Sequence, residues 1–377
     1  ALITTTDSAG RIDSNRVSIT RRQLVSLTLS YGIDTLVSLP DSVVIAVTGE
    51  SGSTLTWSTD SITWTPFTGA YTQKQSGRVL IRAQLAGKDD KIASLKAFTL
   101  FKRTPVYTHG MLKASGNRIL DAHGNPVQLA GMSLSWPLWG GELFFNATAV
   151  KSAIDLFGVN LIRAPMAVAS GSQIYYSRDL TPIKTVIEAA IANGIYVIVD
   201  WHSVSTNPLQ VQADSFFREI ASAYGRSPNV IFEIWSAPAG PTWNAVKQYA
   251  EVVIDTIRNY SENLVIVGTP NWSQSVDLAA ASPLAKRNIA YALQFFACTH
   301  GSALRTRAQA AADSLPLFFS EWTPTATTGI GNICLSEADA WLALAKANHI
   351  SWTNWSLWSK ADSWDAVMTN GPVTGPW

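Results

Sequence analysis

The sequence of 377 residues has little charge, and what it has is balanced. Charged residues make up 15% of the chain, and 28 Lys and Arg against 27 Asp and Glu give a formal net charge of +1 with no basic cluster. Nucleic-acid binders usually concentrate positive charge on one face, so we expect no nucleic-acid partner. Apolar runs such as Ile195–Asp200 are far shorter than the ~20 residues that cross a bilayer, so we expect no membrane span.

Cysteine and histidine are also scarce. The two cysteines, Cys298 and Cys334, neither require an oxidising compartment nor exclude one disulfide, so their pairing stays open. The five histidines are scattered without the spacing of a metal site, and we expect neither a metal nor a cofactor. A chain that opens at Ala1 instead of Met is typical of a processed product that has lost a signal peptide, so we expect a secreted protein.

Tryptophan, in contrast, is abundant. The chain holds 15 Trp, and 47% of its residues are hydrophobic, which is ample material for a core. Trp rings fill cores, and they also stack on the flat faces of sugars. The excess therefore indicates either a Trp-rich core or a carbohydrate-binding surface.

The first hundred residues alternate apolar and polar side chains in short runs separated by Ser, Gly, Asp and Thr. Period-two alternation with turns at this spacing is typical of a small antiparallel β-sandwich. We predict an immunoglobulin-like accessory domain over residues 1–105. Its expected strands are Val17–Thr20, Val25–Leu29, Val43–Val47, Thr54–Trp57, Val79–Leu85 and Lys96–Phe101.

From about residue 127 the pattern changes to β-rich runs that recur every 25 to 35 residues, with amphipathic stretches between most of them. Strand and helix alternating eight times predict a (β/α)₈ TIM barrel over residues 106–377. A hairpin at Gly116–Pro126 is expected to close the barrel floor. The predicted strands are Val127–Leu134, Leu161–Ala167, Tyr196–His202, Val230–Ser236, Leu264–Pro270, Ile289–Phe296, Pro316–Trp322 and Ser351–Trp358; four predicted helices are Leu180–Asn193, Ala213–Tyr224, Trp243–Tyr260 and Ser336–Ala347.

Active sites of such barrels lie at the carboxyl ends of the strands. Trp occurs at six of the eight predicted strand ends, where a rim is wetter than a core. This favours a saccharide-binding cleft. The candidate contacts are Trp139, Trp201, Trp235, Trp272, Trp322, Trp355 and Trp358, together with Arg163, His202 and Lys360.

Six sequence blocks in order resemble glycoside hydrolase family five, specifically its bacterial endoglucanases of the cellulase type. The resemblance runs from about Gly116 to Trp377 and leaves the N-terminal hundred residues outside. It implies a secreted bacterial protein whose last barrel helix would follow Trp377, so that the chain stops before the barrel closes. The blocks are GNPVQLAGMS at 124–133, NGIYVIVDWH at 193–202, PNVIFEI at 228–234, IVGTPNWSQ at 266–274, SEW at 320–322 and NWS at 354–356.

This resemblance implies retaining hydrolysis of a β-1,4-glucan by two carboxyl groups ~5–5.5 Å apart. The family's nucleophile position is Glu321. Its acid/base position, in an Asn-Glu-Pro motif after the fourth strand, is Ala237 here. The nearest carboxylate in sequence, Glu233, is expected to lie ~13 Å deeper along the strand at ~3.3 Å per residue. We therefore expect no efficient hydrolysis by the family route.

Further departures from the family fall at the same strand ends. The Asn beside the acid is Ser236, and a His-Phe-Tyr after the sixth strand becomes Gln294-Phe295-Phe296. We count Ser236, Gln294 and Phe296 among the candidate substrate contacts. Arg163, His202, Glu321 and Trp355 keep the family's residue types.

The sequence favours a non-catalytic protein that binds a β-linked polysaccharide. One alternative is a residual or altered retaining β-1,4-glycosidase, including an inactivated variant. A second is a structural or interaction protein of a cell-surface or viral assembly. The glycan and the oligomeric state stay open at this stage.

Overall fold

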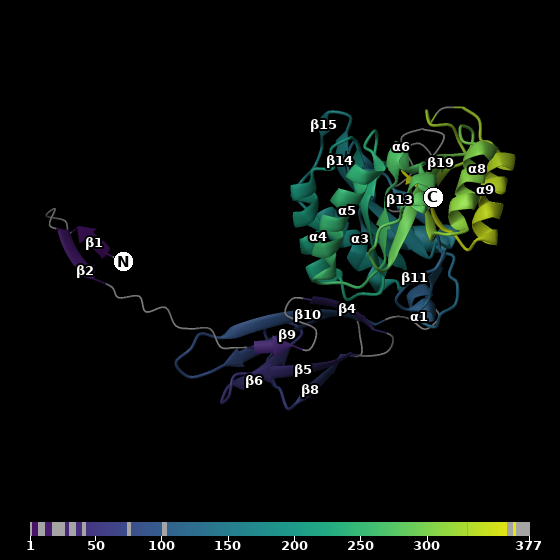
Figure 1. Cartoon of the computed structure of the whole chain (residues 1–377). Helices are drawn as coiled ribbons and strands as arrows, with labels where there is room; N and C mark the ends of the chain where they lie inside the picture. Colours follow the sequence, from purple (N-terminus) through teal and green to yellow (C-terminus); the bar gives the residue numbers. More distant parts are fainter. Residues whose placement is uncertain are drawn as a thin grey trace. The chain divides into compact units, whose positions relative to one another are not determined.

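The computed structural model describes residues 2–6, 12–16, 27–29, 35–39, 43–73, 77–99, 104–329, 331–359 and 365–366. The chain divides into two compact units (Figure 1). The first consists of Ala1–Thr35, Val43–Gln73 and Gly77–Lys96, and the second of Leu36–Ser42, Lys74–Ser76 and Ala97–Trp377.

The N-terminal strands form three small sheets. One joins β1 and β2, another has the order β4-β10-β9-β6-β7, and a third has the order β3-β5-β8. The predicted run Val17–Thr20 lies outside the described residues, and the immunoglobulin-like sandwich over 1–105 stays a prediction. The strands are β1 (Leu2–Thr6), β2 (Ile12–Arg16), β3 (Leu27–Leu29), β4 (Thr35–Leu39), β5 (Val43–Gly49), β6 (Thr54–Ser58), β7 (Thr65–Pro66), β8 (Ala70–Gln73), β9 (Gly77–Gln84) and β10 (Lys91–Thr99).

The second unit contains a closed barrel of eight parallel strands, as the sequence predicts. The hydrogen-bonded order is β13-β21-β20-β19-β18-β17-β16-β14, and β13 also pairs with β14. The barrel strands are β13 (Ala130–Leu134), β14 (Leu161–Ser170), β16 (Tyr196–Val204), β17 (Val230–Ser236), β18 (Val265–Val267), β19 (Ile289–Phe296), β20 (Leu317–Thr323) and β21 (Ser351–Leu357). A short β15 (Gln173–Ile174) adds to the end of β14 in the antiparallel direction.

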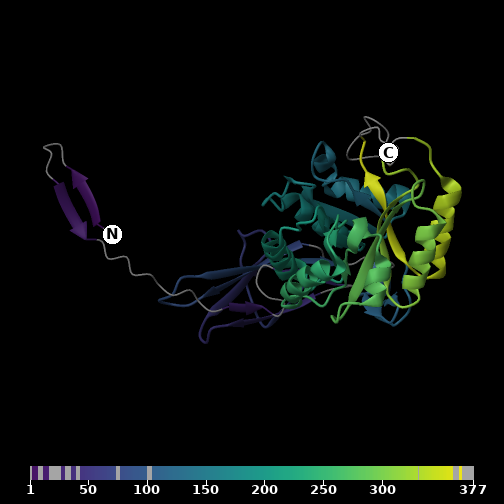
Figure 2. The ribbon, with the colours of Figure 1, turned by 45° about the horizontal axis from the view of Figure 1, so that its top comes forward.

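The expectation that the chain stops before the barrel closes is wrong for the strands. Met132 of β13 lies opposite Asn354 of β21, so the first and last strands complete the ring. Figure 2 shows β21 in yellow beside the strands that precede it. The expected last helix would lie beyond the described residues.

Helices surround the barrel, and their apolar faces pack on the outer side of the strands. The four helices predicted from the sequence are confirmed to within three residues at each end. The helices are α1 (Pro105–His109), α2 (Ala147–Phe157), α3 (Thr181–Ala192), α4 (Gln210–Tyr224), α5 (Trp243–Arg258), α6 (Pro270–Ser273), α7 (Val276–Ala281), α8 (Ser302–Ala312) and α9 (Leu335–Ala347), with a 3₁₀ turn η1 (Gly141–Phe144).

Local chemistry explains where these helices begin and end. The Thr242 side chain accepts a hydrogen bond from the backbone N–H of Ala245 at the start of α5, and Asn146 does the same for Ala149 at the start of α2. Such caps satisfy backbone donors that have no partner within the helix. At the end of α2, Gly158 takes the left-handed conformation that stops the helix.

The barrel interior is apolar at its floor and polar toward its carboxyl end. The floor is sealed by Val106 of α1 and by a hairpin of β11 (Lys113–Ser115) and β12 (Arg118–Leu120), whose Ile119 is buried. This hairpin begins before the predicted one at Gly116–Pro126 and overlaps only its first part. The floor side chains pack with Tyr196 and Ile198 of β16. Because successive residues of a strand alternate in direction, the next interior positions of β16 are Asp200 and His202.

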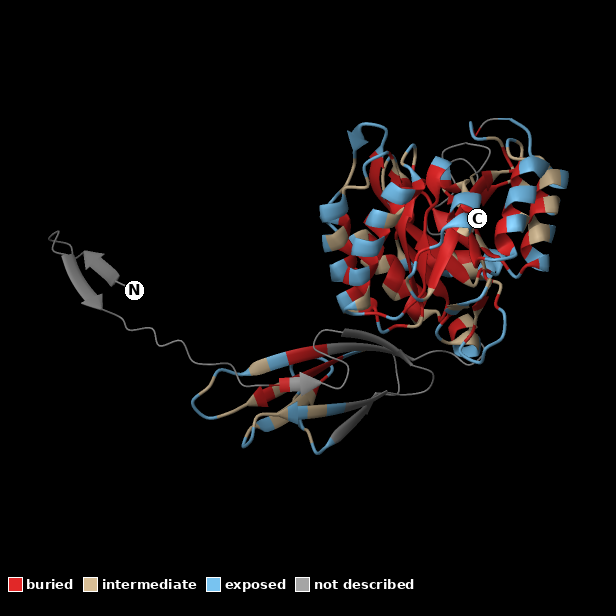
Figure 3. Cartoon of the chain, in the orientation of Figure 1, coloured by how far each residue is buried: buried red, intermediate tan, exposed pale blue. Residues whose placement is uncertain are grey.

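The residues between these positions on β16 face the helices. Val197, Val199 and Trp201 belong to the larger apolar cluster that also includes Phe216 and Phe217 of α4. Figure 3 shows this layer, with buried strands in the middle of the second unit and exposed residues along the outer sides of its helices. The alternation thus separates a packing face from an inward face that reaches the carboxyl end of the barrel.

Candidate functional site

A pocket of about 510 Å³ opens at the carboxyl end of the barrel. We call it the Glu321 pocket. Its volume lies within the range of small-molecule sites, ~300–1,000 Å³. It is lined by His202, Val204, Ala237, Asn271, Trp272, Gln274, Gln294, Phe296, His300, Glu321 and Thr327.

The strand register brings several predicted site residues to one level. Gln294 of β19 lies opposite Glu321 of β20, and His202 of β16 lies opposite Ser236 of β17. The side-chain amide of Gln294 donates a hydrogen bond to the Ser236 hydroxyl at 2.7 Å. Residues distant in sequence therefore form one polar layer beneath the pocket.

Arg163 of β14 organises this layer from below. Its Nη2 lies 2.7 Å from Asp200 Oδ2, its Nε lies 2.8 Å from Glu233 Oε2, and its Nη1 lies 3.2 Å from Glu321 Oε2. Nη2 also donates to the Ser236 hydroxyl at 2.7 Å. One fully buried guanidinium thus holds three carboxyl groups.

The burial of this cluster changes its protonation. Burial raises the pKa of Asp200 from 3.8 to about 7, against the opposing effect of Arg163. Burial likewise raises the pKa of Glu233 and of Glu321. Burial would lower the pKa of Arg163, but the charges of Asp200, Glu233 and Glu321 outweigh it and raise that pKa. The arginine is therefore charged at any ordinary pH.

The two histidines of the pocket are neutral near pH 7. Burial lowers the pKa of His202 from 6.5 to about 4, and burial also lowers the pKa of His300. His202 Nδ1 lies 3.0 Å from Asp200 Oδ2. His300 Nδ1 accepts a hydrogen bond from the backbone N–H of Phe296 at 2.9 Å, and His300 Nε2 lies 3.1 Å from the amide nitrogen of Gln274.

Ala237, which the sequence resemblance predicts at the family's acid/base position, lines the pocket. Its backbone has φ of 55°, in the left-handed region that disfavours residues with a Cβ. Among the described residues that line the Glu321 pocket, Glu321 is the only one with a carboxyl group. The site therefore has the nucleophile position of the predicted pair and a methyl group at the other.

Trp272 stands at the edge of the pocket with 49% of its surface exposed. Asn271, Trp272 and Ser273 all have positive φ. This strained segment is fixed by hydrogen bonds from Trp272 N–H to the Pro238 carbonyl at 3.0 Å and from Ser273 N–H to the Thr269 carbonyl at 2.9 Å. Such strain commonly occurs at functional sites, and here it presents a flat ring to the pocket.

Three predicted Trp contacts are wrong because these rings lie in the core. Trp201 is fully buried against Phe216, and its Nε1 donates to the Pro208 carbonyl. Trp235 is buried beside Tyr249, and its Nε1 donates to the Ser203 carbonyl. Trp322 is buried and stacks on Phe295. Period-two alternation already argued against Trp201, because His202 beside it faces inward.

The other residues predicted to contact substrate lie at different positions relative to the Glu321 pocket. Arg163 and Ser236 are fully buried and do not line the Glu321 pocket, so their predicted direct contact with substrate is wrong. Trp355 lies with its ring 6.0 Å from His202, and Trp358 packs partly buried against the outer core. Lys360 lies outside the described residues.

Glu233 is closer to the site than its strand position suggests. We expected its carboxyl group ~13 Å below the acid position from the strand rise of ~3.3 Å per residue, but it shares the Arg163 guanidinium with Glu321. The estimate from the strand rise counts the backbone alone and ignores the lengths of the Glu233 and Arg163 side chains. Glu233 is nevertheless fully buried and outside the pocket lining.

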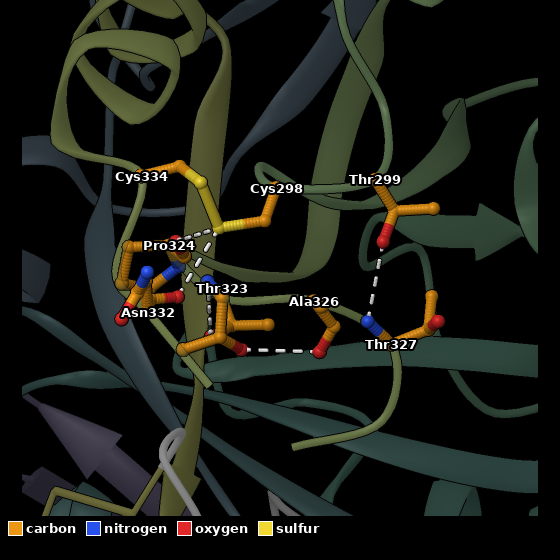
Figure 4. Close-up of a disulfide and its surroundings, with 9 residues drawn as sticks. Cys298, Thr299, Thr323, Pro324, Ala326, Thr327, Asn332 and Cys334 are labelled. Atoms are coloured by element: carbon orange, nitrogen blue, oxygen red, sulfur yellow. Dashed lines mark hydrogen bonds between the residues drawn. A yellow bond between two sulfur atoms is a disulfide. The ribbon is translucent and has the colours of Figure 1, made fainter. Parts of the chain in front are cut away.

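Cys298 and Cys334 form a disulfide with a Cα–Cα distance of 5.3 Å (Figure 4). It joins the segment after β19 to the segment before α9. The backbone N–H of Cys298 donates to the Thr325 carbonyl at 3.0 Å, and that of Cys334 donates to the Pro324 carbonyl at 2.8 Å. Thr327 N–H donates to the Thr299 hydroxyl in the same region. The disulfide thus fixes the segments that carry His300 and Thr327 of the pocket wall.

Several residues near the site were not among the predicted contacts. Trp136, in the segment between β13 and η1, lies edge-on with its ring 5.0 Å from the His202 ring. Tyr175 contacts both Trp136 and Trp139. Trp136 follows a predicted strand end directly, so its position was a usable signal. His300 and Gln274 lie beyond the strand ends on segments whose course the sequence pattern does not give.

No helix in the described part of the chain is long and apolar enough to cross a membrane. No group of three or more His, Cys, Asp and Glu side chains among the described residues is placed to hold a metal ion.

Comparison with known proteins gives one consistent result. Residues 120–361 match the model of the family described as Cellulase (glycosyl hydrolase family 5). The chain is 38% identical over 288 residues to Endoglucanase N from Pectobacterium atrosepticum, covering 74% of this chain and 65% of that protein. It is 42% identical over 253 residues to Endoglucanase Z from Dickeya dadantii, covering 65% of this chain and 59% of that protein.

Solved structures give the same match. The catalytic domain of a Thermobifida fusca endoglucanase aligns with a TM-score of 0.67 and 30% identity, covering 73% of this chain and 94% of that domain. A structure from Cytophaga hutchinsonii aligns with a TM-score of 0.69 and 38% identity, covering 73% of this chain and 91% of the other. The match spans 57% to 65% of the length of the first three curated relatives.

Proposed function

Because the chain belongs to the cellulase family, glycosyl hydrolase family 5, we propose that its barrel binds a β-1,4-linked glucan in the Glu321 pocket without hydrolysing it efficiently. The observation that carries this proposal is the lining of the pocket, in which Glu321 is accompanied by no second carboxyl group among the described residues. Retaining hydrolysis requires two such groups on opposite sides of the glycosidic bond.

No other group of the pocket replaces the missing acid. His202 and His300 are neutral near pH 7, because burial lowers the pKa of both. Glu233 is fully buried beneath Arg163 and does not reach the pocket. A leaving oxygen would therefore depart without a proton, and general acid/base catalysis of this kind contributes ~10²–10⁴-fold in rate.

The features that bind a sugar are present without the acid. Trp272 presents an exposed ring at the pocket edge, and aromatic rings stack on the apolar faces of pyranoses. Gln294, Asn271 and Gln274 offer amide groups to hydroxyls. Binding alone needs no group that acts only in the transition state.

Isothermal titration calorimetry with cellopentaose, followed by a long hold in the cell, tests this proposal. We expect saturable heat, a flat baseline during the hold and unchanged cellopentaose afterwards. Continuous heat with shorter sugars in the cell would contradict the absence of hydrolysis. No heat at all would contradict glucan binding and would favour the structural or interaction role.

A slow retaining glycosidase is the second candidate, favoured by the endoglucanase names of the relatives and by the retained Glu321. An activated aryl cellobioside distinguishes it, because an aryl leaving group needs little protonation. Release of the phenol that disappears in Glu321→Gln would support this candidate. Release that persists in Glu321→Gln would come from a contaminant or another group.

We further propose that the protein is secreted by a bacterium and that residues 1–105 form an immunoglobulin-like accessory domain. The Cys298–Cys334 disulfide supports an oxidising compartment, and the three small sheets support an all-β unit. Fractionation of the producing cells tests the first part. Limited proteolysis that yields a resistant N-terminal fragment tests the second.

A further inference from the structure

The Glu321 pocket contains one acidic side chain and no strongly basic one. Among the described residues that line it, Glu321 is the only one with a carboxyl group, and Lys and Arg are absent. Its two histidines, His202 and His300, are neutral near pH 7, because burial lowers the pKa of both. The lining therefore offers a ligand negative charge and no positive charge that would balance it.

One carboxylate oxygen of Glu321 is available to a ligand. Arg163 Nη1 donates to Oε2 at 3.2 Å, and within the described part of the chain no donor contacts Oε1. The Glu321 side chain is 11% exposed and lines the pocket. Phe296 lines the same pocket with an apolar ring and has no donor to offer. Oε1 is thus an acceptor that a ligand can satisfy.

The charge of Arg163 does not cancel that of Glu321. The same guanidinium lies 2.7 Å from Asp200 Oδ2 and 2.8 Å from Glu233 Oε2, so one positive charge faces three carboxyl groups. Burial raises the pKa of Asp200 to about 7, which favours one proton on this cluster. With that proton in place, the cluster still has more negative than positive charge beneath the pocket.

Gln294 adds a second acceptor to the pocket. Its Nε2 donates to the Ser236 hydroxyl at 2.7 Å and to the Ser320 hydroxyl at 3.3 Å. Both hydrogens of this amide are therefore used within the protein, and its carbonyl oxygen is the part left to a ligand. The base of the pocket thus combines a carboxylate with a carbonyl oxygen, which suits a ligand rich in donors.

We propose that the Glu321 pocket prefers a cationic saccharide, namely a β-1,4-linked glucosamine chain whose C2 ammonium group pairs with Glu321, over the neutral glucan. This inference rests on the proposed function and deepens it, since it names the favoured ligand of the same site. A carboxylate in the nucleophile position lies ~3–3.5 Å from the anomeric carbon. C2 is bonded to that carbon, so a group on C2 lies beside the carboxylate. An ammonium there makes a charge-assisted hydrogen bond, roughly twice as strong as a neutral one.

Isothermal titration calorimetry with cellopentaose and with the glucosamine pentamer tests this preference. At weakly acidic pH, where the amines carry their protons, we expect the full chain to bind the amino sugar about tenfold more tightly. The two pentamers have the same length and linkage, so the ratio of their affinities isolates the effect of the amino groups. The formal net charge of the protein is +1, which gives no general attraction for a cationic sugar.

Two variants assign the preference to the pocket. Glu321→Gln removes the charge and nearly keeps the shape, so the ratio of the two affinities should fall to about one. Ala237→Lys places a positive charge in the lining without touching the Arg163 cluster, and it should reverse the preference even if Glu321→Gln does not fold. Glu251→Gln is the matched control and should keep the ratio of the unchanged chain, because Glu251 is an exposed carboxylate of α5 outside the pocket lining.

The outcomes separate this inference from the proposed function. Equal or weaker affinity for the amino sugar, with cellopentaose bound, would overturn the inference and leave the proposed function intact. A preference that persists in Glu321→Gln would assign the cation to another site and would also overturn it. Binding of the amino sugar alone, lost in Glu321→Gln, would support the pairing and contradict the neutral glucan as ligand. Absence of heat with both sugars would overturn both proposals.

Discussion

At the scale of single residues, the surroundings of Glu321 suit the nucleophile role that the sequence predicts for it. Arg163 holds its carboxyl group in place, and Gln294 lies opposite it across the strand pair. What the pocket lacks is an acid at the Ala237 position. The backbone there already accommodates a Cβ at φ of 55°, so a longer side chain adds no further backbone strain.

We therefore expect Ala237→Glu to raise the hydrolysis of cellopentaose, whose sugar leaving group needs a proton, at least about tenfold. This is less than the ~10²–10⁴-fold effect of a positioned acid, because Ser236 and Phe296 also depart from the family's residues. Chromatography of the shorter sugars measures it. Ala237→Gln, which has nearly the same shape and no proton to give, should show no gain. A folded Ala237→Glu protein without any gain would mean that the absent acid does not limit turnover.

Trp272 is the residue whose ring we expect to carry most of the stacking. Trp272→Ala should weaken the binding of cellopentaose about tenfold, because loss of ~1.4 kcal/mol corresponds to that factor. Titration calorimetry measures the change. Tyr107→Ala on α1, an exposed aromatic at the barrel floor, is the control and should bind as before. Equal weakening in both variants would contradict a specific role for Trp272.

Asp200 and His202 are expected to affect the pH dependence of stability in opposite directions. The pKa of Asp200 is raised from 3.8 to about 7 by burial, so its stabilising contribution is complete below 3.8 and is lost as the pH rises to 7. The pKa of His202 is lowered from 6.5 to about 4 by burial, so its contribution is complete above 6.5 and is lost as the pH falls to 4.

Asp200→Asn should remove the Asp200 contribution, which opposes that of His202. The free energy of unfolding of this variant should then fall as the pH falls from 6.5 toward 4, more steeply than that of the unchanged chain. Urea unfolding at several pH values measures it. Asp155→Asn, which changes an exposed carboxylate on α2, should follow the unchanged chain. Parallel curves for Asp200→Asn and the unchanged chain would contradict the opposition of the two groups.

The sequence predicted which strand ends form the site better than it predicted which of their side chains point into the pocket. Glu321, Ala237, His202, Gln294 and Phe296 line one pocket because their strand ends were identified correctly. Trp201 and Trp235 were wrongly assigned to the cleft together with the next residues, His202 and Ser236. Successive residues of a strand point to opposite faces, so the two Trp rings point into the core instead.

At the scale of elements, the disulfide between the segments after β19 and before α9 is the feature that defines one pocket wall. We expect Cys298→Ser with Cys334→Ser to lower the free energy of unfolding by about 2–4 kcal/mol, since the bond closes a long loop. The affinity for cellopentaose should fall as well, because His300 and Thr327 lose a common anchor.

Thermal unfolding and calorimetry on the double variant measure the two effects. Ser302→Ala, just beyond the disulfide at the start of α8 and without a side-chain cap hydrogen bond at that end, is the control for a small change in the same segment. A stability loss with unchanged affinity would mean that the disulfide stabilises the fold and has no effect on the pocket wall.

The strands and helices of the barrel were predictable because their periodicity repeats eight times and each repeat supports the next. The segments between them were not. Trp136 lies where a chain leaves β13 and turns toward η1, and its contact with His202 depends on a course that hydrogen bonds and Gly141 determine. No periodic pattern encodes such a course.

At the scale of the whole molecule, every residue of the Glu321 pocket lies between 202 and 327. We therefore expect a chain that begins at residue 104 to bind cellopentaose with an affinity within about twofold of the full chain. Calorimetry on the two proteins measures it, with circular dichroism as the check that the shorter chain folds. A loss of more than about tenfold would mean that the N-terminal unit contributes to binding.

The Arg163 cluster has a consequence for how this barrel can change over evolutionary time. Replacing Arg163, Asp200 or Glu233 leaves unpaired charge in the barrel interior. Breaking such a buried pair lowers the free energy of unfolding by ~3–5 kcal/mol. Glu321 is tied to the same guanidinium. Glu321 therefore contributes to the stability of the fold. A lineage that no longer cleaves glucan would keep Glu321 for that reason.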